Sequence, residues 1–258
     1  MQLDLAGKTV VVTGGSKGIG FACAQSLLAE GARVVICSRS QANIDRALTT
    51  LPGAIGFAAD LTSEEEALGL VDQAEAAVGP IDILVNCAGA ARRTPPQDLS
   101  PAHWRAAMDA KYFSYINVID PVVKRMAARG TGVIVNVIGG GGKVASPIHL
   151  PGGAANSALM LATVGLANAY AASGVRVVGI NPGSTETERV TEGLKAEAAL
   201  HGISEQAALE KMVQRIPFGR MATAEEIANV VTFLSSSKAS YVTGVIIGMD
   251  GASTPIVV

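Results

Sequence analysis

A glycine-rich segment near the N-terminus has the residue types and spacing of a site for the phosphates of a dinucleotide. Residues 13–20 read TGGSKGIG and lie between an apolar run and a helical pattern. Glycines at these positions permit a tight turn, close approach of the backbone to a pyrophosphate, and close helix packing. The N–H groups that open the helix then face the phosphates. The contacts predicted here are Gly14, Ser16, Lys17, Gly18, Ile19 and Gly20.

The end of the second apolar run favours NADP(H) over NAD(H). An Asp or Glu at that point would bind the ribose 2′-hydroxyl of NAD and repel a 2′-phosphate. Residues 37–40 read CSRS and contain no acid. Arg39, next to Ser38, suits bidentate binding of a phosphate, and Lys17 adds a second positive charge nearby. The alternative is that Arg39 is a solvated surface charge.

Short apolar runs alternate with helical patterns along the whole chain. This alternation predicts an α/β protein with a three-layer, doubly wound parallel sheet of about seven strands, in a single domain over 1–258. Helix starts are indicated by Ser63 with Glu66, by Thr223 with Glu226, and by Ser100 before Pro101. The predicted strands are Thr9–Thr13, Arg33–Cys37, Ile55–Ala58, Ile81–Val85, Val133–Val137, Val175–Ile180 and Val245–Ile247.

A polar, weakly periodic stretch over residues 184–214 interrupts this rhythm. An insertion after the carboxyl end of a strand in an open α/β sheet lies over the ligand crevice. We therefore expect a lid on the substrate side. The alternative is a plain surface excursion.

Composition excludes several classes of function. Charged residues make up 16% of the 258 residues, aromatic residues 4%, and the net charge is -2. These values do not suggest a nucleic-acid surface. The N-terminus lacks the pattern of a signal peptide, and we expect no membrane-spanning stretch. Three cysteines without metal-like spacing predict no metal site and fit a cytoplasmic, reducing location.

These motifs together resemble the short-chain dehydrogenase/reductase family of small, roughly 250-residue proteins. The resemblance rests on TGGSKGIG (13–20), Asp60-Leu61, NCAG (86–89), NPG (181–183) and residues 215–251. It implies that Asp60 contacts the adenine ring. It also implies a homodimer or homotetramer formed by helices that start near Pro101 and Gly153. Further cofactor contacts implied by the resemblance are Leu61, Asn86, Ala88, Gly89, Pro182, Gly183, Thr185 and Thr187.

The resemblance fails at the positions that act on the substrate. In this family a Tyr transfers the substrate proton, a Lys four residues later lowers the tyrosine pKa, a Ser holds the carbonyl, and an Asn completes the relay. Alignment on the neighbouring motifs puts Gly152 at the Tyr position, Asn156 at the Lys position, Gly139 at the Ser position and Lys111 at the Asn position. The remaining tyrosines considered, Tyr112, Tyr115 and Tyr170, are not in the expected frame.

Two of these changes look coupled, because the family has Asn early and Lys late whereas this chain has Lys111 early and Asn156 late. If the two side chains meet, Lys111 restores a positive charge near the nicotinamide ribose, with a pKa lowered by desolvation. Otherwise Lys111 forms a salt bridge or a subunit contact. His149, three residues before Gly152, is the candidate replacement acid, although a loop histidine is more often structural.

The run Gly139–Gly142 followed by Lys143 is a further departure from the family. Backbone N–H groups in such a run can hold an anion, which indicates an anionic substrate such as a carboxylate or an acyl-thioester phosphate. The alternative is a flexible loop.

Three functions are compatible with these residues. The first is an NADP(H)-dependent oxidoreductase that moves hydride between nicotinamide and a carbonyl or alcohol substrate through an atypical proton relay. The second is a catalytically silent NADP(H)-binding protein, acting as a sensor or partner subunit. The third is a non-redox enzyme that uses Lys111 as a base on the same scaffold.

Overall fold

A seven-stranded parallel sheet forms the centre of the protein, with strand order β3-β2-β1-β4-β5-β6-β9. The computed structural model describes residues 1–89 and 91–256. The strands are β1 Thr9–Thr13, β2 Arg33–Ser38, β3 Ile55–Ala58, β4 Ile83–Asn86, β5 Gly132–Val137, β6 Val175–Pro182 and β9 Ile246–Met249. This confirms the predicted doubly wound sheet. Strand β6 runs past the predicted Ile180 because Asn181 and Pro182 pair with β9.

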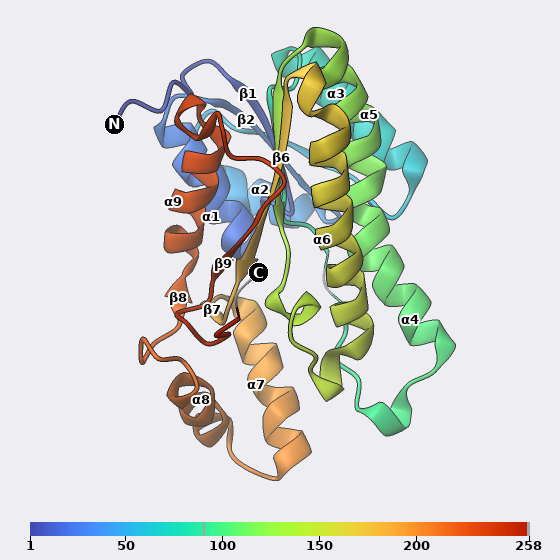
Figure 1. The fold of residues 1–258 in the computed structure, drawn as a ribbon, viewed down its shortest axis with the longest axis vertical. Coiled ribbons are helices and arrows are strands. Elements are labelled where there is room, and N and C mark those ends of the chain that lie inside the picture. The colour runs from blue at the N-terminus through green and yellow to red at the C-terminus, as the bar shows by residue number, and fades with distance from the viewer. Residues whose placement is uncertain (90, 257–258) are drawn as a thin grey trace.

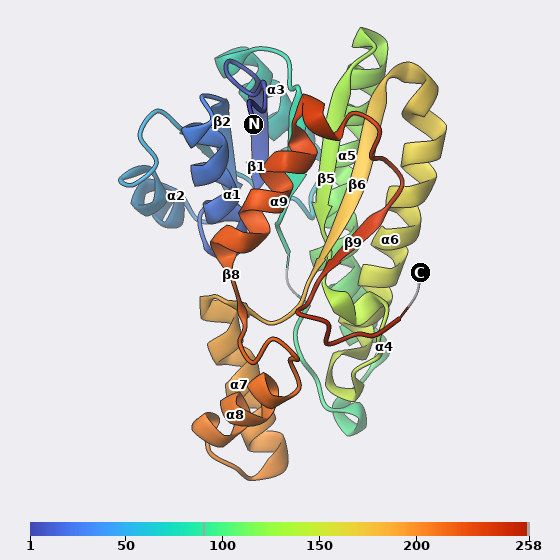
Figure 2. The same cartoon turned by 60° about the vertical axis from the view of Figure 1, so that its left-hand side comes forward.

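Helices cover both faces of the sheet (Figures 1 and 2). One face carries α1 Gly18–Ala29, α2 Gln41–Leu48 and α9 Ala224–Ser235. The other carries α3 Glu64–Val78, α5 Ser114–Arg129 and α6 Leu150–Tyr170. Successive residues of β1 enter different cores, since Val10 and Val12 pack with the first group and Val11 with the second. Such alternation follows from the two-residue period of a strand buried on both faces.

Helix α4, Pro101–Ala107, continues into α5 through a π-helical turn at Met108–Phe113. Ser100 and His103 form a reciprocal cap at the start of α4. The helix thus begins at Pro101, after Ser100, as predicted. The predicted capping box at Thr223 and Glu226 is complete. At Ser63 only half of the box forms, because the carboxylate of Glu66 accepts from the backbone N–H of Asp60 instead. Short 3-10 turns cover Pro96–Asp98, Gly140–Gly142, Pro147–His149, Ala171–Ser173 and Ser237–Ala239.

A chain of buried polar groups joins the carboxyl ends of three strands. Thr13, Asn86 and Asn136 are paired across β1, β4 and β5. The Thr13 hydroxyl donates to Asn86 Oδ1 (3.3 Å), Asn86 Nδ2 donates to Asn136 Oδ1 (3.0 Å), and Asn136 Nδ2 donates to Thr163 Oγ1 on α6 (3.0 Å). Because buried polar groups are costly when unpaired, this chain holds the three strand ends and α6 in one register.

Residues 184–214 form a pair of helices, α7 Glu188–His201 and α8 Glu205–Gln214, instead of an irregular polar loop. They pack on each other through Leu194, Ala198 and Ala208. The short parallel strands β7 Thr185–Glu186 and β8 Ala222–Thr223 join the pair to the sheet. Both helices, drawn in orange, extend beyond the carboxyl ends of the central strands (Figures 1 and 2).

Helix α6 with its flanking turns, Pro147–Ser173, is long and apolar enough to span a membrane by length and composition alone. The expectation that no stretch reaches this length was therefore wrong. A core helix passes the same test, and one side of α6 is buried against the sheet through Leu159, Thr163 and Ala167. We therefore assign α6 to the core.

Candidate active site

The glycine loop between β1 and α1 packs directly on the start of the loop after β4. A Cβ added to Gly14 would lie 2.9 Å from Cα and N of Ala88, and one on Gly20 would overlap the carbonyl of Gly14. Gly18 has φ +53°, which glycine adopts without strain. Gly89 has φ +88°, and a Cβ there would overlap the carbonyl of Ala110. The loop therefore leaves no room for side chains on its inner surface.

The outer surface of the glycine loop contacts the predicted lid. The Lys17 ammonium, half exposed, lies 3.2 Å from a carboxylate oxygen of Glu188, the first residue of α7. A Cβ on Gly18 would lie 3.4 Å from the methyl group of Thr187. The positive charge predicted at Lys17 is thus partly compensated by Glu188.

The adenosine side of the predicted site lies at the ends of β2 and β3. Arg39 is exposed and follows Ser38, the last residue of β2. The pKa of Asp60 is lowered, mainly by hydrogen bonds from the backbone N–H and hydroxyl of Thr62, with a smaller contribution from the Arg39 charge. Leu61 is buried beside Asp60. A cation and an ionised carboxylate therefore flank this part of the crevice.

The side chain of Asn86 points into the sheet, and its contact with the cofactor stays a prediction. Both polar atoms of its amide are engaged inside the sheet with Thr13 and Asn136. The residues after it, Ala88 and Gly89, are the ones that approach the glycine loop and α4–α5. Sequence spacing placed Asn86 at the right strand end but did not reveal which way its side chain points.

The NPG motif forms the end of β6. Asn181 is buried and donates through Nδ2 to Ile138 O (2.8 Å), while its Oδ1 has no partner among the described residues. Gly183 packs against Asp250, and the Thr185 hydroxyl donates to Gly183 O (3.1 Å). Pro182 pairs with Met249 of β9. Pro182 thus ends β6, and Gly183, Thr185 and Thr187 follow it between β6 and α7.

Gly139 and Asn156, the residues predicted to stand at the family's Ser and Lys positions, face each other. A Cβ on Gly139 would lie 2.9 Å from Asn156 Nδ2, so the amide occupies space next to the vacated serine position. Asn156 is 3% exposed, and its Oδ1 has no hydrogen-bond partner among the described residues. A buried acceptor of this kind is costly unless a ligand donates to it.

The Tyr position, Gly152, is filled by a neighbour. A Cβ on Gly152 would overlap the imidazole of His149, and it would lie 2.8 Å from Cβ of Ala91. His149 precedes α6, and its backbone N–H donates to Ser146 O (2.9 Å). The imidazole therefore lies beside Gly152, and its role as a replacement acid stays a prediction.

Lys111 lies at the other side of the same strand end. Its ammonium donates to Val137 O (3.1 Å) and to the hydroxyl of Tyr115 (2.7 Å). It is not hydrogen-bonded to Asn156, so the two side chains approach the end of β5 separately, at Val137 and at Gly139. The contact between Tyr115 and Lys111 was not predicted, because Tyr115 does not fall at the position of the family's Tyr. The signal that finds it is its spacing of four residues from Lys111 on one helix face.

The glycine run after β5 is a 3-10 turn rather than an open loop. The N–H groups of Gly142 and Lys143 donate to Gly139 O and Gly140 O. The Ser157 hydroxyl donates to Gly142 O (2.7 Å), which fastens the turn to α6. Part of the anion cradle expected from the glycine run is therefore already used within the turn.

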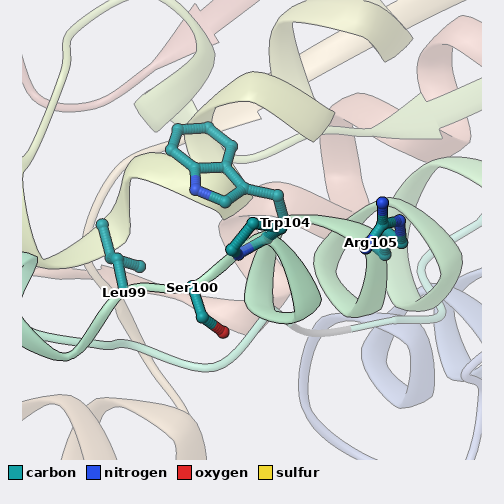
Figure 3. A pocket seen from close by; sticks show the side chains of 5 residues that line it. Leu99, Ser100, Trp104 and Arg105 are labelled. Atoms are coloured by element: carbon teal, nitrogen blue, oxygen red, sulfur yellow. The ribbon is translucent and has the colours of Figure 1, made fainter.

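A shallow cavity of about 410 Å³ lies at the start of α4, away from the predicted site residues. It is lined by Leu99, Ser100, Pro101, Trp104 and Arg105. Figure 3 shows the indole of Trp104 standing out from α4, with Arg105 next to it on the same helix. Trp104 is 40% exposed, which leaves a large apolar group on this surface.

Comparisons with known proteins agree with this arrangement. Residues 14–254 match the family model described as enoyl-(acyl carrier protein) reductase. Gluconate 5-dehydrogenase of Gluconobacter oxydans is 32% identical over 256 residues, covering 97% of this chain and 96% of that protein. A solved actinorhodin polyketide ketoreductase with NADPH superposes with TM-score 0.92, at 28% identity, over 95% of this chain and 97% of that chain. L-Sorbose reductase of Gluconobacter frateurii, complexed with NADPH and L-sorbose, has TM-score 0.90, 27% identity, and coverage of 97% and 98%.

The seven-stranded parallel sheet with helices on both faces, and the glycine loop after β1, define a Rossmann-type oxidoreductase scaffold. The chain belongs to the short-chain dehydrogenase/reductase family.

Proposed function

We propose that this protein is an NADP(H)-dependent oxidoreductase that acts on a carbonyl or alcohol through an atypical proton relay. The observation that carries the proposal is the buried, unpartnered Oδ1 of Asn156 at the family's Lys position, beside an intact glycine cradle. In the family, the residue at that position binds the hydroxyls of the nicotinamide ribose. A ribose hydroxyl could donate the hydrogen bond that Asn156 Oδ1 does not receive from the described residues. NADPH in two related solved structures supports a nicotinamide cofactor.

The residues present fit such a cofactor. Gly14, Gly18 and Gly20 would hold the pyrophosphate, Asp60 the adenine side, and Pro182 to Thr187 the nicotinamide side. When bound, the nicotinamide supplies or accepts the hydride.

The preference for the phosphorylated form rests on Arg39. It is exposed at the end of β2, and no acid stands at residues 37–40. Lys17 contributes less than its position suggests because Glu188 is paired with it. Fluorescence titration with NADPH and NADH tests this, with Arg39→Asp expected to shift preference toward NADH. The control is Arg46→Asp, which changes an exposed arginine on α2. It should not change the ratio of the Kd values for NADPH and NADH.

The proton relay is assigned to His149, Lys111 and Asn156. The imidazole of His149 occupies the place where a side chain at Gly152 would begin, and an imidazole can carry a proton, so His149 transfers the substrate proton. Lys111 provides the positive charge at the end of β5, and Asn156 orients the ribose. With these roles, His149 replaces the family's Tyr as the proton carrier, and Lys111 replaces the family's Lys as the cation.

Turnover decides between this proposal and a silent binding protein. Purified protein is mixed with NADPH and a panel of ketones, aldehydes and quinones, and the absorbance of the reduced nicotinamide is followed. We expect turnover, and we expect His149→Gln to lower it by roughly 10²–10⁴-fold. His201→Gln, in the lid, is the matched control. Tight NADPH binding without turnover on any compound would refute the oxidoreductase and leave the silent NADP(H)-binding protein.

An anionic substrate is supported by Arg93 rather than by the glycine turn. The Arg93 guanidinium lies 3.3 Å from the position of a Cβ on Gly193 of α7, and no carboxylate partner is found for it in the described part of the chain. The backbone N–H of Thr94 donates to Ile148 O, which holds this segment next to His149. Arg93→Gln is expected to raise KM for a keto acid but not for its methyl ester. Equal KM changes for both compounds would refute an anionic substrate.

We also propose that the protein is a homodimer or homotetramer. Large apolar side chains are exposed on the α4–α6 side of the molecule, among them Trp104, Phe113, Leu161 and Val164. Sedimentation velocity should show an oligomer that Leu161→Glu dissociates. Leu200→Glu, exposed in the lid, should leave the oligomer intact, and a monomeric wild type would refute this point.

A further inference from the structure

Tyr115 is fully buried directly beneath Lys111. It lies in the first turn of α5, and it is 0% exposed. Lys111 is 8% exposed and lies in the π-helical turn that precedes α5. A phenol buried to this degree does not touch a substrate. Any effect of its hydroxyl on the reaction must pass through the groups that the hydroxyl contacts.

The hydroxyl takes part in hydrogen bonds of defined direction. It donates to Val137 O (2.7 Å), so its lone pairs are left to accept the ammonium of Lys111 (2.7 Å). The same ammonium donates to Val137 O (3.1 Å), which closes a triangle of three polar groups. Charge-assisted bonds in a buried site are strong and directional.

The aromatic ring adds a second contact. Lys111 Nζ lies 4.3 Å from the centroid of the Tyr115 ring, within the range of a cation–π interaction. Both the ring and the hydroxyl of Tyr115 thus face one ammonium. The π-helical turn at Met108–Phe113 sets this geometry, and such turns are frequent at functional sites.

The triangle stands at the strand end that carries the altered site. Val137 ends β5, and Gly139, two residues on, faces the Asn156 amide. We infer that Tyr115 is a positioning residue that holds the Lys111 ammonium at the carboxyl end of β5. This inference rests on the proposed function, because it assigns the location of the cation that replaces the family's late lysine.

The first test reads Lys111 directly. In NADPH-bound protein with ¹³C-labelled lysine, the Cε resonance of Lys111 is identified by its loss in Lys111→Met. Tyr115→Phe is expected to shift that resonance and no other lysine resonance. Tyr112→Phe, which removes a hydroxyl from the same turn, is the control and should leave it in place. An unchanged Lys111 resonance in Tyr115→Phe would overturn the inference.

The second test uses turnover of the best substrate found above. We expect Tyr115→Phe to lower kcat about tenfold or more, with KM and the NADPH Kd unchanged, because misplacement of a reacting group costs rate. The double variant with Lys111→Met should be no slower than Lys111→Met alone. Losses that multiply in the double variant would show that Tyr115 does not act through Lys111.

The two tests separate the inference from the function on which it rests. If wild type reduces no compound, the oxidoreductase is refuted, while the lysine resonance still decides the role of Tyr115. If Tyr115→Phe does not fold, 3-fluorotyrosine at position 115 keeps the packing and weakens the oxygen as an acceptor. The Lys111 resonance is then expected to shift, and its constancy would overturn the inference.

Discussion

The imidazole of His149 lies in the space that any side chain at Gly152 would occupy. The two residues therefore depend on each other: glycine at 152 is what allows the histidine ring to enter the site.

Gly152→Ala is expected to displace His149 and to destabilise the protein by about 1–3 kcal/mol through overpacking. The matched control is Gly165→Ala in the same helix, where an added Cβ meets nothing within 4 Å. That change should stabilise by about 0.5–1 kcal/mol, because alanine favours a helix. Urea unfolding measures both, and equal stability of Gly152→Ala and wild type would contradict the assigned contact.

Glu188→Gln should tighten NADPH binding about two- to fivefold at low ionic strength, because it releases Lys17 from its exposed ion pair. The gain should vanish near 1 M salt. Glu197→Gln serves as the control, since Glu197 is in the same helix and pairs with His201. Isothermal titration measures the Kd, and a gain that persists in high salt would argue against an electrostatic origin.

Asn136→Ala should destabilise the protein by about 1–3 kcal/mol, because it leaves Asn86 Nδ2 buried without its acceptor. Asn117→Ala removes a partly exposed hydrogen bond to Leu61 O and should cost less, about 0.5–1.5 kcal/mol. Denaturant midpoints give the comparison. A smaller loss at Asn136 than at Asn117 would show that the buried chain of amides does not stabilise the sheet.

Cys37 is expected to resist thiol reagents in the folded protein at pH 8. Burial raises its thiol pKa to about 12, from 9.0, so the reactive thiolate is scarce. The pKa of buried Cys23 is also raised, mainly by a hydrogen bond with Cys87. Partly exposed Cys87 should react first, and Cys87→Ser should remove the fast phase.

The raised pKa of Cys37 also has a consequence for stability. Because the folded state keeps its proton more tightly, this contribution is present below pH 9.0 and is lost as the pH rises toward 12. A Cys37→Ala variant should therefore lose less stability than wild type over that window.

The sheet was predictable because it depends on local patterns, and the cofactor contacts, which rest on local motifs, stay predictions. Each apolar run marks a strand, and TGGSKGIG needs only its flanking elements to define a phosphate cradle. The helices of the lid were not recognised, since their shared core consists of small residues such as Ala198 and Ala208.

The contacts of the substrate half could not be predicted from the sequence. Counting from neighbouring motifs gave Lys111, Gly139, Gly152 and Asn156 as the altered positions, and that assignment stays a prediction. It could not show that Lys111 bonds to Tyr115, because that bond depends on the π-helical turn and on the end of β5. Likewise, only the structure shows that Asn86 turns into the sheet.

The packing of α1 against α9 has a consequence for how the chain is made. Cys23, Ala24 and Leu27 of α1 share one core with Ile227, Ala228 and Val231 of α9, and the hydroxyl of Thr232 donates to Ser26 Oγ (2.8 Å). Helix α1 is synthesised before all the other helices that separate it from α9. Its apolar surface therefore stays uncovered on the nascent chain until α9 has been made, and during that interval it is exposed to aggregation.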